Sequence, residues 1–178
     1  LGDGQFVIHP LPREAQMAPL FGLQLRDMDE DGHLDILGVG NYYPTEVISG
    51  WYDAHKGLFL RGNGKGTFEA INEMASGFRL EGDARALVKL SIENGQELLL
   101  ASLNNDSLRV FRKKSATTSQ RIVLHPNEIR GEIKLKDGRT RKYECYRGQG
   151  YLSQPTCVLE IDSTVRSVTI FDLNGKSR

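Results

Sequence analysis

The sequence predicts an all-β protein, and three observations support this prediction. Short apolar runs are separated by turn residues, with 19 Gly and 6 Pro among the 178 residues. No long segment keeps the 3.6-residue apolar period of an amphipathic helix. A unit of about 60 residues also occurs about twice, and such self-similarity is typical of repeat architectures.

The repeat is visible when the sequence is aligned with itself. Residues 1–6 (LGDGQF) align with residues 63–68 (NGKGTF) at an offset of 62. Residues 29–41 (DEDGHLDILGVGN) align with residues 92–104 (IENGQELLLASLN) at an offset of 63. Two separate matches at nearly the same offset indicate a duplicated structural unit.

Each copy of the unit predicts short strands that flank glycine turns. Strands are expected at residues 20–27, 34–40 and 57–62 in the first copy and at residues 84–92, 97–103 and 107–113 in the second. The N-G-K-G sequence at residues 63–66 predicts a hairpin turn rather than a phosphate-binding loop. Four short strands per unit are typical of a β-propeller blade. About two blades do not close a ring, so we expect further blades or another chain to cover their edges.

The composition changes after residue 111. The polar segment 112–120 (RKKSATTSQ) is predicted to be a linker between a first domain, residues 1–111, and a second domain, residues 121–178. Residues 132–145 predict a hairpin with an Asp-Gly turn at its tip. The second domain is therefore expected to be a small β-sandwich or barrel-like domain. At this size it would depend on contacts with the first domain for its stability.

The charge distribution gives no reason to expect a nucleic acid or a membrane as a partner. The 23 basic and 23 acidic residues cancel, although residues 1–120 hold 12 Lys and Arg against 16 Asp and Glu. The basic residues of the second domain are interleaved with acidic ones, which favours a solvated face over a nucleic-acid surface. No apolar run approaches the roughly 18 residues of a membrane span. The chain begins with Leu1 rather than Met, and we interpret it as a piece of a longer protein.

The segment 27–35 (DMDEDGHLD) carries the candidate metal ligands. Alternate positions of this loop hold the five predicted ligand residues Asp27, Asp29, Asp31, His33 and Asp35. Calcium takes six to eight oxygen ligands, which the carboxylates, the backbone carbonyl of His33 and water can supply. An EF-hand is excluded because Gly38 stands where its bidentate Glu would lie and because strands flank the loop. We therefore predict a structural calcium site.

The second copy of the unit provides a comparison for this prediction. At the offset of 63, the four aspartates correspond to Leu90, Ile92, Asn94 and Leu98. Gly95 still matches the turn glycine Gly32, but the carboxylates are missing. The second copy is expected to bind no metal.

Other candidate residues lie on a loop and in the second domain. Residues 41–53 concentrate the aromatic side chains Tyr42, Tyr43, Trp51 and Tyr52. They suit stacking on a sugar or a protein partner, with packing between blades as the alternative. Cys145 and Cys157 either form a disulfide worth on the order of 3 kcal/mol or are two buried thiols. No nucleophile lies in a recognisable setting, so no catalytic residue is predicted.

Two resemblances rest on these motifs. Residues 1–111 resemble the FG-GAP/VCBS repeats of integrin-α-like β-propellers, in which a D-x-D-x-D-G-x-x-D loop between two blade strands holds calcium. The second domain is similar to the ASPIC/UnbV domain, and its matching residues are Gly131, Ile133, Gly148, Gly150, Tyr151, Leu152, Ser153 and Gln154. The match ends after Gln154. Together the resemblances imply the C-terminal portion of a secreted, cartilage-acidic-protein-like or bacterial surface protein.

These observations favour a non-enzymatic, calcium-binding adhesion or ligand-binding module. We expect it outside the cytosol, in an extracellular, cell-surface or periplasmic location, where calcium is abundant. Its expected ligand is a glycan or a protein. The alternative is a fragment of a propeller enzyme, such as a carbohydrate lyase or dehydratase, whose catalytic residues lie in other blades.

Overall fold

The computed structural model describes residues 7–92, 97–113, 120–146, 148 and 156–178. Within these residues the chain forms strands, one short α-helix and one 3₁₀ turn, so the predicted all-β class is confirmed. The strands of the first half are β1 (Leu20–Arg26), β2 (Asp35–Gly40), β3 (Leu58–Gly62), β4 (Phe68–Ile71), β5 (Ala84–Ser91), β6 (Glu97–Leu103) and β7 (Arg109–Arg112). Those of the second half are β8 (Gln120–Val123), β9 (Glu128–Leu135), β10 (Thr140–Glu144), β11 (Val158–Ile161) and β12 (Val165–Asp172). None of the helices described is long and apolar enough to cross a membrane.

The chain divides into two compact units. The first comprises Leu1–Leu87 and Ala101–Arg109, and the second comprises Val88–Leu100 and Val110–Arg178. The strands β5, β6 and β7 therefore each contribute residues to both units. Most of the predicted linker, residues 112–120, lies outside the described residues.

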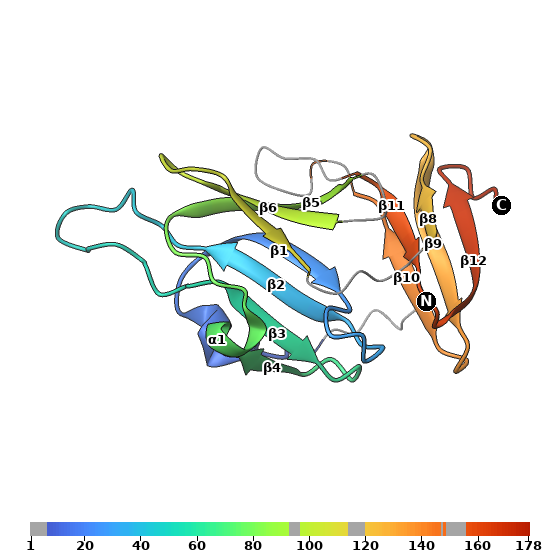
Figure 1. Ribbon diagram of the computed structural model, residues 1–178, viewed down its shortest axis with the longest axis horizontal. Coiled ribbons are helices and arrows are strands. Elements are labelled where there is room, and N and C mark those ends of the chain that lie inside the picture. Colours follow the sequence, from blue (N-terminus) through green and yellow to red (C-terminus); the bar gives the residue numbers. More distant parts are fainter. Residues whose placement is uncertain (1–6, 93–96, 114–119, 147, 149–155) are drawn as a thin grey trace. The chain divides into compact units, whose positions relative to one another are not determined.

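A four-stranded antiparallel sheet, in the order β1-β2-β3-β4, forms the centre of the first unit (Figure 1). Every residue of β2 is buried, and Leu37 and Val39 are only 2 % and 1 % exposed. On one face, Ile36, Leu58 and Leu60 pack with Ala15 of the 3₁₀ turn Arg13–Gln16. Leu60 is 0 % exposed, so this cluster is the core of the sheet.

The strands β1 and β5 approach each other closely within the first unit. A Cβ atom at Gly22 would lie 2.5 Å from the backbone nitrogen of Leu87, so only glycine allows this contact. The side chain of Gln24 donates a hydrogen bond to the carbonyl of Leu87 at 2.9 Å. The strand β5, at the edge of the β5-β6-β7 sheet, thus lies beside β1, which is an edge strand of the first sheet.

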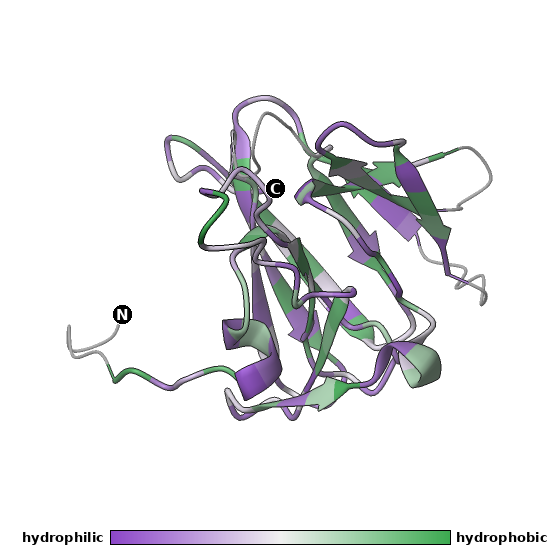
Figure 2. Ribbon diagram, turned by 90° about the vertical axis from the view of Figure 1, so that its left-hand side faces the viewer, coloured by the Kyte–Doolittle hydropathy of each residue, from purple (hydrophilic) through white to green (hydrophobic). Residues whose placement is uncertain are grey.

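The second unit contains the sheets β10-β9-β12 and β11-β8. The predicted hairpin is confirmed, because β9 and β10 pair antiparallel around Gly138, whose φ is 90°. Leu159 of β11 packs against Gly131 of β9, where a Cβ atom would lie 2.6 Å from the leucine side chain. Leu135, Leu159 and Ile170 are almost fully buried, and Figure 2 shows apolar residues interspersed with hydrophilic ones along the strands. Burial of these apolar side chains therefore stabilises both sheets.

One face of the β10-β9-β12 sheet alternates in charge. Lys142 pairs across the strands with Glu132, and Thr140 pairs with Lys134. Arg130 lies 4.3 Å above the ring of Phe171, as a cation–π contact. Acidic and basic groups therefore lie side by side on this face.

A partly buried network of charges joins strands within the second unit. Lys89 lies 3.2 Å from Glu97 and 2.8 Å from Glu160, while Arg121 lies 3.8 Å from Glu97. The Arg121 guanidinium also donates to the carbonyl of Ile92 at 3.4 Å. These contacts connect β5 and β6 to the β8-β11 ribbon.

The pair Glu128–Arg178 predicts how acid affects the second unit. Hydrogen bonds from Arg178 and from the backbone of His125 lower the pKa of Glu128 from 4.5 to about 2. A lowered pKa stabilises the fold above the unfolded pKa, and this contribution is lost as the pH falls from about 4.5 towards about 2. The free energies of unfolding of the chain and of Glu128→Gln, measured by urea denaturation, should differ most at neutral pH and become similar near pH 2. A constant difference across this range would contradict the assignment.

Candidate functional site

The acidic loop, residues 27–34, joins strands β1 and β2. Asp27 follows the last residue of β1, and Asp35 is the first residue of β2. The two strands are antiparallel, and Arg26 pairs with Asp35 at the end of the ladder. The hairpin therefore brings together Asp27 and Asp35, which lie at opposite ends of the loop in the sequence.

Three of the five predicted ligand residues form a compact cluster. One carboxylate oxygen from each of Asp27, Asp29 and Asp35 lies within 4.8 Å of the other two. Asp29 is exposed, Asp27 is half-buried and Asp35 is 0 % exposed. Carboxylate oxygens are the hard ligands that calcium prefers, so this cluster can hold a divalent cation.

Backbone hydrogen bonds shape the acidic loop. The nitrogen of Gly32 donates to Asp27 Oδ2 at 2.9 Å, and the nitrogen of His33 donates to Asp31 Oδ1 at 2.7 Å. Gly32 has a φ of 88°, in the left-handed region that favours glycine. The sharp turn predicted at this glycine is confirmed.

Asp35 is the most constrained carboxylate of the cluster. Its Oδ2 accepts a hydrogen bond from the nitrogen of Met28 at 2.8 Å, and its Oδ1 accepts one from the nitrogen of Gly62 at 2.9 Å. Burial raises the pKa of Asp35, the two backbone hydrogen bonds oppose this rise, and the charges of Asp29 and Asp27 add to it. A bound cation would remove the repulsion between these charges.

The side chains of Asp31 and His33 lie outside the three-carboxylate cluster. Asp31 is exposed and accepts a hydrogen bond from the His33 nitrogen. The His33 imidazole lies against the β3–β4 turn, where a Cβ atom at Gly64 would be 2.2 Å from His33 Nδ1. The predicted role of His33 concerns its backbone carbonyl and stays a prediction.

A cleft of about 400 Å³ lies beside the acidic loop. Arg61 and Glu69 form an ion pair there at 2.7 Å. The pKa of Arg61 is raised, first by Glu69 and then by the charges of Asp29 and Asp31. The negative potential of the acidic loop therefore extends to this cleft, whose lining residues are Asp31, His33, Arg61, Gly62, Asn63, Thr67, Phe68 and Glu69.

The four predicted aromatic residues form two pairs at the base of the loop between β2 and β3. Tyr42 and Tyr52 exchange two backbone hydrogen bonds, at 2.9 and 3.0 Å. The rings of Tyr43 and Trp51 stack with centroids 4.5 Å apart and an interplanar angle of 11°. Trp51 is 67 % exposed, so one of its faces is open to a ligand.

Tyr42 also contacts residues outside the loop, and Tyr43 contacts Asp53 on the opposite side of the loop. The Tyr42 ring lies 6.3 Å from that of Phe21 and 5.1 Å from the guanidinium of Arg85. The hydroxyl of Tyr43 donates to Asp53 at 2.7 Å. Burial, followed by this hydrogen bond, raises the pKa of Tyr43 to about 12. Tyr42 thus packs within the first unit, whereas Tyr43 braces the loop.

Asn41 anchors this loop, and it is the main residue that the sequence analysis missed. It is 1 % exposed, and its side-chain nitrogen donates to the carbonyls of His55 and Gly82 at 2.8 and 2.9 Å. Its side-chain oxygen accepts from the nitrogen of His55 at 2.9 Å. The signals in the sequence are the position of this asparagine directly after a buried strand and its alignment with Asn104 in the repeat.

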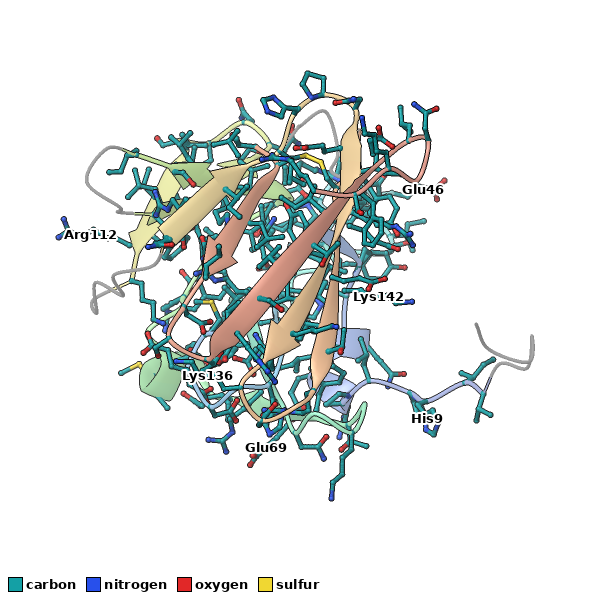
Figure 3. The ribbon with its side chains drawn as sticks, turned by 90° about the vertical axis from the view of Figure 1, so that its right-hand side faces the viewer. His9, Glu46, Glu69, Arg112, Lys136 and Lys142 are labelled. Carbon is teal, nitrogen blue, oxygen red and sulfur yellow. A yellow bond between two sulfur atoms is a disulfide. The ribbon has the colours of Figure 1, made fainter. Side chains whose placement is uncertain are left out.

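Cys145 and Cys157 are joined by a disulfide, drawn in yellow in Figure 3. Their Cα atoms lie 5.7 Å apart, within the usual range for such a bond. Cys145 follows β10 and Cys157 precedes β11. The bond therefore links the two sheets of the second unit.

The second copy of the acidic loop lies partly outside the described residues. Leu90 and Leu98 occupy their predicted strands β5 and β6, and Asn94 falls among residues 93–96, which are not described. The cluster around Asp35 is the one group of metal-binding type found among the described residues.

No protein-family model matches the chain, and no curated protein sequence matches it. Its chemistry is therefore inferred from the geometry of the acidic loop and of the aromatic pairs.

Proposed function

We propose that this chain is a calcium-stabilised, non-enzymatic module that binds a glycan or a protein outside the cytosol. The observation that carries the proposal is the cluster of Asp27, Asp29 and Asp35, whose oxygens lie within 4.8 Å of one another where β1 and β2 meet. Three carboxylates converging on one point repel each other unless a cation is bound.

The donor set fits calcium better than a softer metal. All three side chains offer oxygen, and calcium also accepts backbone carbonyls and water in a flexible geometry. Oxygens that already accept a backbone hydrogen bond keep a second lone pair for a cation. When bound, the ion would neutralise the cluster and tie β1 to β2. Asp27, Asp29 and Asp35 would hold it.

The sheet order supports a propeller-type architecture of FG-GAP/VCBS character. The strands β1 to β4 pair in sequence order, as the strands of a propeller blade do. The strands β5, β6 and β7 also pair in sequence order, and β5 and β6 begin 64 and 62 residues after β1 and β2, close to the offset of the sequence repeat. Residues 121–178 would be the ASPIC/UnbV-like domain, and further blades of a longer or separate chain would cover the remaining edges.

The proposed location outside the cytosol has two supports. A site with only three carboxylates needs abundant calcium, which the extracellular space provides. The disulfide between Cys145 and Cys157 is of a kind that persists in oxidising compartments.

Thermal denaturation in calcium and in EDTA tests this proposal. Calcium should raise the melting temperature of the chain, because it binds only the folded loop. Asp29→Ala should abolish most of this rise, since its exposed carboxylate belongs to the cluster. Asp31→Ala is the matched control and should retain most of it. Equal melting temperatures of the unaltered chain in both solutions would contradict the proposal.

A further inference from the structure

The loop between β2 and β3 projects beyond the ends of these strands (Figure 1). We call residues 41–55 the arm. At its tip, the nitrogen of Ser49 donates to the carbonyl of Glu46 at 3.0 Å and closes a turn. The two central residues of this turn, Val47 and Ile48, are 99 % and 97 % exposed. Turn tips favour small polar residues, so two exposed, branched aliphatic side chains at this tip indicate a binding site.

The arm is braced rather than loose. Thr45 Oγ1 donates to the carbonyl of Gly50 at 2.6 Å, just behind the tip. The Tyr43–Trp51 stack lies next, followed by the hydrogen bonds between the two legs at the base. A braced loop presents its tip without a large loss of conformational entropy on binding.

The chemistry of the arm changes from its tip to its base. Val47 and Ile48 are purely aliphatic, whereas Trp51 and Tyr52, 67 % and 51 % exposed, are amphipathic aromatics. Aliphatic side chains suit the acyl region of a lipid bilayer, and Trp and Tyr prefer its interface with water. We propose that the arm inserts its tip into the surface of a bilayer that carries zwitterionic choline head groups.

The charge of the arm determines which lipid head groups it can approach. Residues 41–55 contain Glu46 and Asp53 but neither Lys nor Arg, so an anionic surface would repel the arm. The Glu46 carboxylate is exposed beside the tip, and the aromatic face of Trp51 is open (Figure 3 labels Glu46). A carboxylate and an aromatic face are the groups that bind the quaternary ammonium of choline.

This binding is separate from the proposed calcium site. The acidic loop precedes β2, and the arm follows it, so the strand Asp35–Gly40 separates them by about 20 Å. Two aliphatic side chains bind a bilayer no more tightly than a single myristoyl chain, whose association constant is about 10⁴ M⁻¹. The interaction is therefore reversible, with half-saturation at about 0.1 mM lipid or above.

Trp51 provides a direct readout because it is the single tryptophan of the chain. The full chain is titrated with phosphatidylcholine vesicles in EDTA while its fluorescence is recorded, and co-sedimentation measures the bound fraction. We expect a blue shift of the emission that saturates with lipid. Ile48→Asp should weaken binding by at least about 10-fold. Leu173→Asp, which adds the same charge at a residue 68 % exposed in the second unit, should bind normally.

Three results of the experiments with phosphatidylcholine would overturn the proposal. The first is an unchanged emission spectrum at millimolar phosphatidylcholine, and the second is equal binding by the chain and Ile48→Asp. The third is a blue shift that needs no vesicles and grows with protein concentration, which would assign the arm to a second copy of the chain. Adding phosphatidylglycerol should weaken binding, and a stronger interaction would contradict the choline assignment. Because the titration is done in EDTA, its outcome is independent of the calcium proposal.

Discussion

Replacement of Asp35 by alanine is expected to lower the free energy of unfolding by about 2–4 kcal/mol in EDTA. The substitution leaves the backbone nitrogens of Met28 and Gly62 without their acceptor, and each buried donor without a partner costs about 1–3 kcal/mol. It also removes the one fully buried carboxylate of the cluster, so the stabilisation by calcium should disappear. Urea denaturation with and without calcium measures both effects.

Two controls separate these effects. Asp35→Asn keeps one oxygen acceptor but no charge, so it should lose less stability than the alanine variant and still lose most of the calcium effect. Asp31→Ala removes an exposed acceptor at the loop surface and should change the stability by less than about 1 kcal/mol. An alanine variant at position 35 that is as stable as the unaltered chain would refute the role given to this carboxylate.

Loss of the disulfide is expected to have the next largest effect. Cys145 and Cys157 are 12 residues apart, and a bond that closes a loop of this size stabilises a domain by about 3 kcal/mol. The double variant Cys145→Ser/Cys157→Ser should therefore unfold at lower urea concentration. The loss of stability should appear in the second unit, which contains both cysteines.

A reducing agent provides the control for this prediction. It should destabilise the unaltered chain by a similar amount and have no effect on the double variant, because that variant has no cysteine left. If the unaltered chain unfolds at the same urea concentration with and without reductant, the disulfide contributes nothing to stability.

Much of the strand arrangement could be predicted because the apolar runs and turn residues are local signals. The β9–β10 hairpin is an example, since the Asp-Gly sequence at residues 137–138 predicts the turn between its two strands. The short helix α1 (Glu73–Ser76) was not predicted, because four residues are too few to show a period. Its caps were nevertheless visible: Asn72 accepts from the nitrogen of Met74 at 2.7 Å, and Gly77 has a φ of 70°.

The candidate site was predictable in its location but less so in its detail. The expectation that alternate side chains point inward assumes an extended backbone. Glu30 and Gly32 instead have φ values of 66° and 88°, and these left-handed residues break the alternation beside Asp31. The donor from Gly62 to Asp35 comes from a different hairpin, 27 residues away. Such contacts depend on the packing of the sheet and leave no local pattern in the sequence.

Calorimetric titration of the chain with calcium tests the central claim most directly. We expect one site per chain, lost in Asp29→Ala and retained in Asp31→Ala, with binding that weakens as the pH falls because protons compete for the carboxylates. No heat of binding at millimolar calcium, together with unchanged stability, would contradict it. The three carboxylates would then form only a solvated acidic turn, and the proposed location outside the cytosol would lose its main support.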